Sequence, residues 1–267
     1  MQKFERDYAA LVAKVLKEGE RRSTRNADTV AIFGESLVVE MNGDGTFPLI
    51  QGRKMYPAGV FGEFAAMIRE PKSVADFERW GCNYWKSWAK PNGSIEVDYG
   101  NAWFAGGQIA RLKDCLANNP TDRRMLINAW RPERLNKLDL PCCHYSYQFY
   151  VREGKYLDML WSQRSVDVMV GLPSDIVLAA TWLIMLGNEF GLLPGRIKMD
   201  LGDTHVYHSH IQAAEAYLDR VENSPVLPPY NYTLTVPPGT NFLSYEPTHI
   251  ELSSARDLGK LPLELHA

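Results

Sequence analysis

The segment that decides the fold begins with PCCH at residues 141–144. It continues with YQFYV at residues 147–151, a run of aromatic and β-branched residues that is typical of a strand. It then reads QRSVD at residues 163–167 and GLPSD at residues 171–175. A thiol, an imidazole, an arginine and two carboxyls thus lie among strand-forming residues, and together they favour covalent catalysis on an anionic substrate.

Of the four cysteines in the chain, Cys143 is the best candidate for a nucleophile because it directly precedes His144. Cys142 is its obvious rival, and we expect Cys82 and Cys115 to be structural, since most lone cysteines are buried apolar residues. Nearby arginines can lower the pKa of the reactive thiol. The chain contains no C-x-x-C pair, so neither a zinc ribbon nor a thioredoxin-type site is predicted.

Length and composition are typical of a single globular domain. The 267 residues suffice for a large core, and 45% apolar and 23% charged residues are ordinary values for such a protein. The net charge of −3 offers no basic field for nucleic acid. The charged N-terminus lacks an apolar signal core, and no run of 18 apolar residues exists, so we expect a cytoplasmic protein without a membrane span.

Hydrophobic periodicity predicts helices and strands in mixed order. Helical spacing is found at residues 4–20, 58–69, 107–118, 176–190 and 208–222. We expect residues 30–33 and 37–41 to form a hairpin around Gly34 and Glu35. Further strands are predicted at residues 125–130, 196–201, 230–236 and 242–251. Because this order lacks βαβ regularity, we predict an α+β fold.

Three features of the N-terminal half allow more than one interpretation. RRSTR at residues 21–25 is either a solvated loop or an anion-binding loop, since arginine forks match phosphate oxygens. Four of the seven tryptophans lie in residues 80–104, where they form either part of the core or a stacking wall for a flat ring. Glu63 lies among apolar residues, where a carboxyl is costly unless it is hydrogen-bonded, and a structural role is one interpretation.

Taken together, these residues resemble the thymidylate synthase family. The resemblance rests on CH at 143–144, QRSxD at 163–167, GLP at 171–173 and GDxHxY at 202–207, with Cys142 where the family usually has proline. Upstream motifs in family order are IFG at 32–34, FPL at 47–49, Glu63, WxxW at 85–88, YG at 99–100 and RR at 123–124. The resemblance implies one catalytic domain over residues 1–267, with a mixed sheet flanked by helices and a homodimer formed through the sheet.

The resemblance also implies roles for individual residues. Cys143 is expected to add to C6 of a pyrimidine, with Glu63, His144, Tyr99 and Asp175 as the other catalytic residues. The residues expected to bind the nucleotide are Gln163, Arg164, Ser165, Asp175, His205, Tyr207 and one or more of Arg21, Arg22 and Arg25, of which we choose Arg25. Arg123 and Arg124 are expected to reach the phosphate bound by the partner subunit. The co-substrate is expected to be 5,10-methylenetetrahydrofolate, bound by Trp85, Trp88, Asp167 and Arg53, and no metal is implied.

Asp175 departs from the family pattern in an informative way. The family has Gly-Leu-Pro-Phe-Asn where this chain has GLPSD, so an aspartate replaces the base-reading asparagine, as it does in the related cytidylate and deoxycytidylate hydroxymethylases. A carboxamide complements the N3–H donor and O4 acceptor of uracil, whereas a carboxyl accepts from the N4 amino group of cytosine and shares one proton with N3. An ionised carboxylate would repel O4 of uracil, at a cost of roughly 1–3 kcal/mol. The alternative is that Asp175 only caps a helix that begins near Ile176.

We therefore expect a 5-hydroxymethylase acting on dCMP or CMP. Its last residues, LPLELHA at 261–267, lack the apolar Ala-Val terminus that closes over folate in thymidylate synthases. This difference favours addition of water over reduction by hydride, because solvent order at the site decides between them. The alternatives are a thymidylate synthase or hydroxymethylase acting on dUMP, and a catalytically idle nucleotide-binding protein on the same fold.

Overall fold

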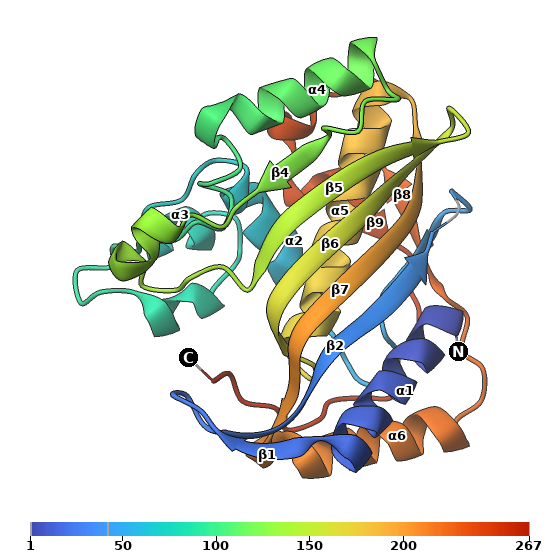
Figure 1. The fold of residues 1–267 in the computed structure, drawn as a ribbon. Helices are drawn as coiled ribbons and strands as arrows, with labels where there is room; N and C mark the ends of the chain where they lie inside the picture. Colours follow the sequence, from blue (N-terminus) through green and yellow to red (C-terminus); the bar gives the residue numbers. More distant parts are fainter. Residues whose placement is uncertain (1, 42, 267) are drawn as a thin grey trace.

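The computed structural model describes residues 2–41 and 43–266. Its centre is a six-stranded sheet (Figure 1). The spatial order is β1 (Glu20–Ser23), β2 (Asp28–Glu40), β7 (Leu193–Tyr207), β6 (Tyr156–Asp167), β5 (His144–Arg152) and β4 (Leu126–Asn128). β6 and β7 run parallel, and the other neighbouring pairs are antiparallel. The fold is therefore α+β with a mixed sheet, as predicted.

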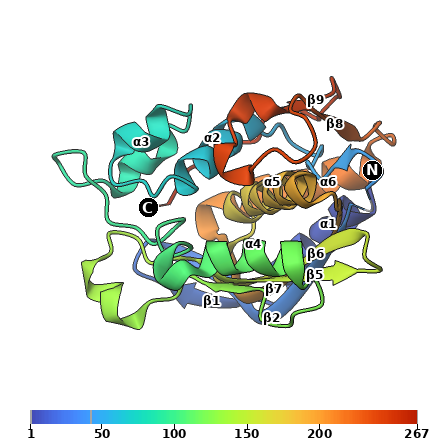
Figure 2. The ribbon, with the colours of Figure 1, turned by 90° about the horizontal axis from the view of Figure 1, so that it is seen from above.

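Helix α5 (Gly171–Phe190) packs against one face of the sheet and forms the centre of the core (Figure 2). The side chain of Asp167 stabilises the start of the helix, because its Oδ1 accepts the backbone N–H groups of Met169 and Val170, the two residues before α5. Pro173 fits within the first turn, where a backbone N–H has no helical partner. Gly191 ends the helix with a φ of 69°. By length and composition α5 could cross a membrane, but 78% of its apolar window is buried inside the protein.

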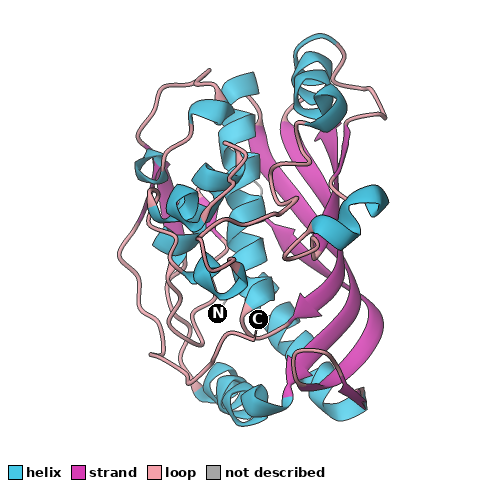
Figure 3. Cartoon of the chain, turned by 90° about the vertical axis from the view of Figure 1, so that its left-hand side faces the viewer, coloured by secondary structure: helices cyan, strands magenta, loops and turns pink. Residues whose placement is uncertain are grey.

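The other elements surround α5 and the edges of the sheet. Helix α1 (Lys3–Glu18) packs on β2 and on α6 (Ile211–Asn223), and α5 lies between the sheet and α2 (Pro57–Met67) (Figure 2). The remaining elements are α3 (Val74–Glu78), α4 (Gln108–Asn118) and a small sheet of β3 (Thr46–Phe47), β8 (Tyr230–Leu234) and β9 (Ile250–Leu252). Short 3-10 helices cover Tyr84–Trp88, Ala105–Gly107, Pro132–Lys137, His208–His210, Phe242–Ser244 and Pro247–His249. Much of the sheet face opposite α5 is left uncovered (Figure 3).

Three predicted elements are wrong in detail. Residues 30–40 belong to one strand, since β2 pairs with β7 in the same register on both sides of Gly34, where a φ of +85° is accommodated within the strand. Phe242–Ser244 and Pro247–His249 form two 3-10 helices, so the predicted strand is reduced to Ile250–Leu252. Helix α5 begins at Gly171 rather than near Ile176, because the glycine and proline that suggest a turn are tolerated in its first turn.

Strand register brings distant sequence motifs together at one end of the sheet. His144 on β5 lies opposite Gln163 on β6, and Asp167 at the end of β6 lies opposite His205 on β7. The chain then passes directly from β6 into α5, which carries GLPSD in its first two turns. The candidate residues therefore converge through sheet pairing and the β6–α5 connection.

Candidate active site

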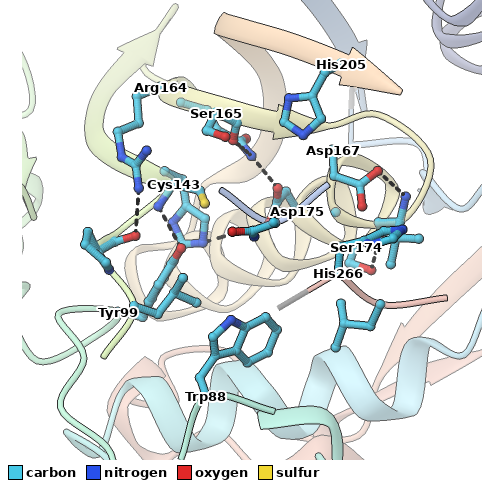
Figure 4. A pocket seen from close by; sticks show the side chains of 18 of the residues that line it. Trp88, Tyr99, Cys143, Arg164, Ser165, Asp167, Ser174, Asp175, His205 and His266 are labelled. Atoms are coloured by element: carbon cyan, nitrogen blue, oxygen red, sulfur yellow. Dashed lines mark hydrogen bonds and ion pairs between the residues drawn. The ribbon is translucent and has the colours of Figure 1, made fainter. Parts of the chain in front are cut away.

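A cavity of about 830 Å³ lies where these segments meet, a volume within the range of small-molecule sites (Figure 4). It brings together most of the predicted site residues: Arg25, Glu63, Trp85, Trp88, Tyr99, Cys143, His144, Gln163, Arg164, Ser165, Asp167, Asp175, His205 and Tyr207. Arg53, Arg123 and Arg124 lie outside this lining. The predicted residues thus form one site in space, with three exceptions.

The loop that carries Cys143 is held from two sides. The backbone N–H of Cys143 donates to the hydroxyl oxygen of Tyr99 at 2.6 Å. Arg164 donates from Nε and Nη2 to the two carbonyls just before Cys143, at 2.8 and 3.0 Å. The register of β5 against β6 also shifts just after Cys143, and such irregularities re-aim side chains beside active sites. Figure 4 shows Tyr99 and Arg164 on either side of the thiol.

The structure distinguishes the two adjacent cysteines. Cys142 is buried, contacts a backbone carbonyl and does not line the cavity, and burial raises its pKa to about 12. Cys143 lines the cavity, which makes it the accessible thiol. Burial also raises the pKa of the Cys143 thiol, although Tyr99 and Arg164 act to lower it. Arg164 thus acts on the pKa in the predicted direction, but in the ligand-free protein desolvation outweighs the arginine.

Glu63 on α2 is almost fully buried at the cavity, yet both of its oxygens accept hydrogen bonds. Tyr84 donates its hydroxyl to Oε2 at 2.6 Å, and Trp85 donates its indole N–H to Oε1 at 2.8 Å. Burial outweighs these bonds and raises the pKa of Glu63 to about 7. The carboxyl therefore titrates near neutral pH, which suits a group that accepts and returns protons.

Asp175 lies in the second turn of α5 and points into the cavity (Figure 4), so the helix-cap interpretation is wrong. Its Oδ2 accepts the side-chain N–H of Gln163 at 2.7 Å, and its Oδ1 lies 3.8 Å from Nε2 of His144. Burial, together with the nearby carboxyls of Glu63 and Asp167, raises the pKa of Asp175 well above its ordinary value. This environment favours the protonated carboxyl.

The N-terminal arginines divide into one that faces the cavity and two that do not. Arg25 lies in the bend between β1 and β2 and lines the cavity. Arg22 is paired with Asp203 at 2.9 Å, and Arg21 is exposed on β1. An exposed guanidinium at the mouth of a cavity suits a phosphate group, because its fork matches phosphate oxygens. Arg25 is thus the best placed of the three arginines considered from the sequence.

The end of the described chain completes one part of the cavity wall. The ring of His266 lies 4.1 Å from that of Tyr207, and its Nε2 shares a hydrogen bond with Ser209 Oγ at 2.8 Å. Nε2 of His210 pairs with the carbonyl oxygen of Glu264 at 2.9 Å. The last two described residues line the cavity. The sequence indicated only that the C-terminal residues lack an apolar terminus, and it did not predict that the imidazole of His266 lines the cavity.

The aromatic segment contributes to both the core and the cavity, so the core interpretation holds for part of it and a stacking wall for a flat ring stays a prediction. Trp103 is fully buried, and Trp85 stacks on Phe77 with ring centroids 4.6 Å apart. Trp88 lines the cavity, and its buried indole N–H has no hydrogen-bond partner among the described residues. A buried donor without a partner beside an aromatic wall fits a flat, polar ring system such as that of a folate.

Two residues assigned to folate have structural contacts of their own. Asp167 lines the cavity while its Oδ1 accepts the backbone N–H groups that precede α5. Arg53 is buried and donates from Nη2 to the carbonyl of Met169 at 2.6 Å. Arg53 therefore supports the connection into α5 from outside the cavity, and any effect it has on a ligand passes through that connection.

Arg123 and Arg124 lie outside the cavity of their own chain. Arg124 is exposed and paired with Asp122, with Nη2 and Oδ2 2.6 Å apart. Arg123 is exposed beside it, and its carbonyl accepts from Gln148. Their assignment to a partner subunit's phosphate stays a prediction.

Two tyrosines that bond to catalytic candidates were not identified from the sequence. Tyr84 donates to Glu63, and Tyr147 contacts both the ring and the carbonyl of His144. Tyr147 is fully buried on β5, so in a sequence it reads as an ordinary strand residue. Its hydroxyl is the feature of the sequence that could have indicated such a contact, because a buried tyrosine hydroxyl requires a polar partner.

A family model described as thymidylate synthase matches residues 6–260, nearly the whole chain. Among residues 2–41 and 43–266, no group of three or more His, Cys, Asp or Glu side chains is arranged to hold a metal ion.

Proposed function

The chain belongs to the thymidylate synthase family, and on that basis we propose that it is a 5-hydroxymethyltransferase for a cytidylate, dCMP or CMP. The family transfers a one-carbon unit from methylenetetrahydrofolate to C5 of a pyrimidine nucleotide, so this protein is a one-carbon transferase. The choice of base and of product is our proposal. The observation that carries it is the carboxyl of Asp175, which lies in the cavity between Gln163 and His144.

Cys143 supplies the nucleophile for the reaction. C5 of a pyrimidine attacks a carbon electrophile only after a thiolate has added to C6, which places electron density on C5. Arg164 and Tyr99 favour the thiolate of Cys143 and hold its loop in place. Glu63, with a pKa of about 7 in the same cavity, is the carboxyl that accepts and returns protons as the adduct forms and breaks.

Asp175 reads the base as a neutral carboxylic acid. One oxygen donates its proton to N3 of cytosine, and the other accepts from the N4 amino group. The raised pKa of Asp175 favours this neutral form over the ionised carboxylate considered from the sequence. A carboxyl whose proton sits on the oxygen that faces N3 rejects uracil, because uracil presents a donor at N3 and an acceptor at O4.

When bound, 5,10-methylenetetrahydrofolate supplies a carbon at the oxidation level of formaldehyde. Trp85, Trp88 and Asp167 are the cavity residues that would hold it. Transfer of this carbon from folate to C5, with loss of the C5 proton, would leave an exocyclic methylene group on the base. Water adds its oxygen to the methylene carbon and gives a proton to Glu63, the electron pair returns to the ring, and Cys143 leaves C6 as the thiolate. The polar imidazole of His266 in the cavity wall favours water at this site.

We also propose that the enzyme is a cytoplasmic homodimer formed through the sheet face opposite α5. That face is largely uncovered in the single chain (Figure 3). Tyr150 on β5 leaves 62% of its surface exposed. In this arrangement Arg123 and Arg124 would reach the partner's phosphate.

The test of this function is turnover of dCMP, CMP and dUMP with methylenetetrahydrofolate, followed by mass analysis of each product. We expect a cytidylate to gain a hydroxymethyl group. Gain of a methyl group, or turnover of dUMP alone, would refute the proposal. One observation favours dUMP as the second candidate: a neutral carboxyl pairs with uracil if its proton moves to the other oxygen.

A further inference from the structure

One buried chain of hydrogen bonds ends on Oδ2 of Asp175, and a second ends at His144, whose Nε2 lies 3.8 Å from Oδ1. On one side, the indole N–H of Trp161 donates to Oε1 of Gln163 at 3.1 Å. An indole nitrogen only donates, so the oxygen of the Gln163 amide faces Trp161 and its nitrogen faces Asp175. That nitrogen donates to Oδ2 of Asp175 at 2.7 Å. Oδ2 is therefore held as an acceptor.

The chain on the other side determines where His144 carries its proton. The hydroxyl oxygen of Tyr147 lies 3.0 Å from the carbonyl oxygen of His144 and 2.5 Å from its Nδ1. A carbonyl can only accept, so the single hydroxyl proton of Tyr147 goes to the carbonyl, and the Nδ1–H of His144 donates to the hydroxyl oxygen. Burial lowers the pKa of His144 to about 3, so the ring is neutral and its Nε2 bears no proton.

The unprotonated Nε2 of His144 faces Oδ1 of Asp175 at 3.8 Å. A negative charge on Oδ1 is unfavourable beside this lone pair in a buried site, whereas a proton on Oδ1 removes the charge and remains available to the base. Gln163 meanwhile occupies Oδ2 with a donor. Both neighbours therefore favour the same oxygen as the site of the carboxyl proton.

We propose that Tyr147, acting through His144, places the proton of Asp175 on Oδ1 and leaves Oδ2 as the acceptor, so that the carboxyl presents one fixed order of donor and acceptor to the base. Tyr147 is thus a positioning residue for base recognition. The placement of the proton stands on its own, and its use in selecting cytosine rests on the proposed function. Cytosine and uracil present opposite orders at N3 and the exocyclic group, so a fixed order matches only one of them.

The groups around Asp175 agree with a protonated carboxyl. The polar and titratable side chains that face it are Gln163 on β6, Cys143 just before β5, His144 and Tyr147 on β5, Glu63 on α2 and Asp167 at the end of β6. The two carboxyls and the burial all oppose a negative charge on Asp175. Activity that needs the protonated form is present below the pKa of Asp175 and is lost as pH rises through it.

Replacing Tyr147 with phenylalanine tests this arrangement. Without the hydroxyl, the His144 ring loses its partner at Nδ1 and is free to carry its proton on Nε2, from which it donates to Asp175 and stabilises the carboxylate. The alkaline limb of kcat/KM for the preferred nucleotide is expected to move down by about one to two pH units, the effect of one hydrogen bond to a charged group. The preference between cytidylate and uridylate is expected to weaken as well.

The matched control is Tyr145→Phe, the same change on the same strand at a residue that packs against Trp130. It should leave the alkaline limb in place. If the alkaline limb of kcat/KM stays in place in a folded Tyr147→Phe variant, the proposal is overturned. Loss of a purely structural contact would change the rate without shifting the pH profile.

A second measurement needs neither a substrate nor the Tyr147→Phe variant. In the wild-type protein with nitrogen-15-labelled histidine, the His144 resonances, assigned by their loss in His144→Asn, should show a neutral ring with its proton on Nδ1. A proton on Nε2 would overturn the proposal. If the tautomer and the pH shift are as expected but uridylate is the substrate, the proton placement stands and the proposed function fails.

Discussion

The hydroxyl of Tyr99 accepts the backbone N–H of Cys143 at 2.6 Å and so joins the nucleophile to a segment more than forty residues upstream. Gly100 makes this contact possible. Its φ is +79°, and a Cβ at this position would lie 2.0 Å from the carbonyl oxygen of Met67. The positions of α2 and of the reactive thiol are therefore coupled through one glycine.

Gly100→Ala is expected to lower both stability and activity. The backbone strain costs about 1–3 kcal/mol, and relief of the clash moves Tyr99 away from Cys143. Gly93→Ala is the matched control, because Gly93 has a φ of +80° with no atom within 4 Å of the added Cβ. Denaturant unfolding and kcat are measured on both variants. Backbone strain is common to the two, whereas only Gly100→Ala adds the clash with Met67, so the difference between them measures the clash. Equal losses in the two variants would contradict the coupling.

Cys143→Ala is expected to abolish turnover, with a loss on the order of 10⁴-fold or more, since removal of a nucleophile leaves only binding and polarisation. Cys142→Ala should retain most of the activity, because that thiol is buried away from the cavity. The check is the rate of product formation, together with mass analysis of the denatured protein for a nucleotide adduct. An adduct that persists in Cys143→Ala would assign the chemistry to another thiol.

Glu63 should make the protein less stable as pH rises. Its pKa is about 7 in the folded state and 4.5 as the reference value. Between these values the unfolded chain has lost the proton that the folded protein keeps, so stability falls with rising pH, by up to on the order of 3 kcal/mol for Glu63 alone. Denaturant unfolding at pH 5 and pH 7.5 should show a smaller decline in Glu63→Gln than in the wild type. An equal decline would refute the assignment.

Asp175→Asn is expected to shift base preference toward uridylate. The carboxamide nitrogen donates to O4 of uracil and its oxygen accepts from N3–H. An unmatched polar contact costs roughly 1–3 kcal/mol, so the ratio of kcat/KM for dUMP over dCMP should rise by about 5- to 150-fold. Ser174→Ala changes the neighbouring residue, whose hydroxyl bonds to the carbonyl of Val170, and should leave the ratio nearly unchanged. An unaltered ratio in Asp175→Asn would remove the role assigned to the carboxyl.

Local patterns in the sequence predicted most of the fold. The amphipathic spacing of residues 4–20 and the apolar run after residue 176 correspond to α1 and α5. The predictions failed where tertiary contacts override local preference. Gly34 looks like a hairpin turn, but pairing with β7 on both sides holds it within one strand. The turn-like GLPSD is helical because Asp167 binds the N–H groups that precede it.

The residues of the site could be named from the sequence, but the hydrogen bonds between them could not be predicted. Cys143, Asp175 and Arg25 could be named because their residue types carry recognisable chemistry. The partners that set their behaviour lie elsewhere in the sequence, as Tyr84 does for Glu63. The direction of the pKa shift at Cys143 depends on burial, and burial is a property of the assembled cavity.

The central claim is that water, rather than hydride, completes the reaction on a cytidylate. The most direct measurement is turnover of dCMP and of CMP in water enriched in heavy oxygen, with mass analysis of the nucleotide at early times. The account predicts a product that carries one hydroxymethyl group whose oxygen comes from the solvent. A methylated product without solvent oxygen, or the absence of product from either cytidylate while dUMP is consumed, would contradict it.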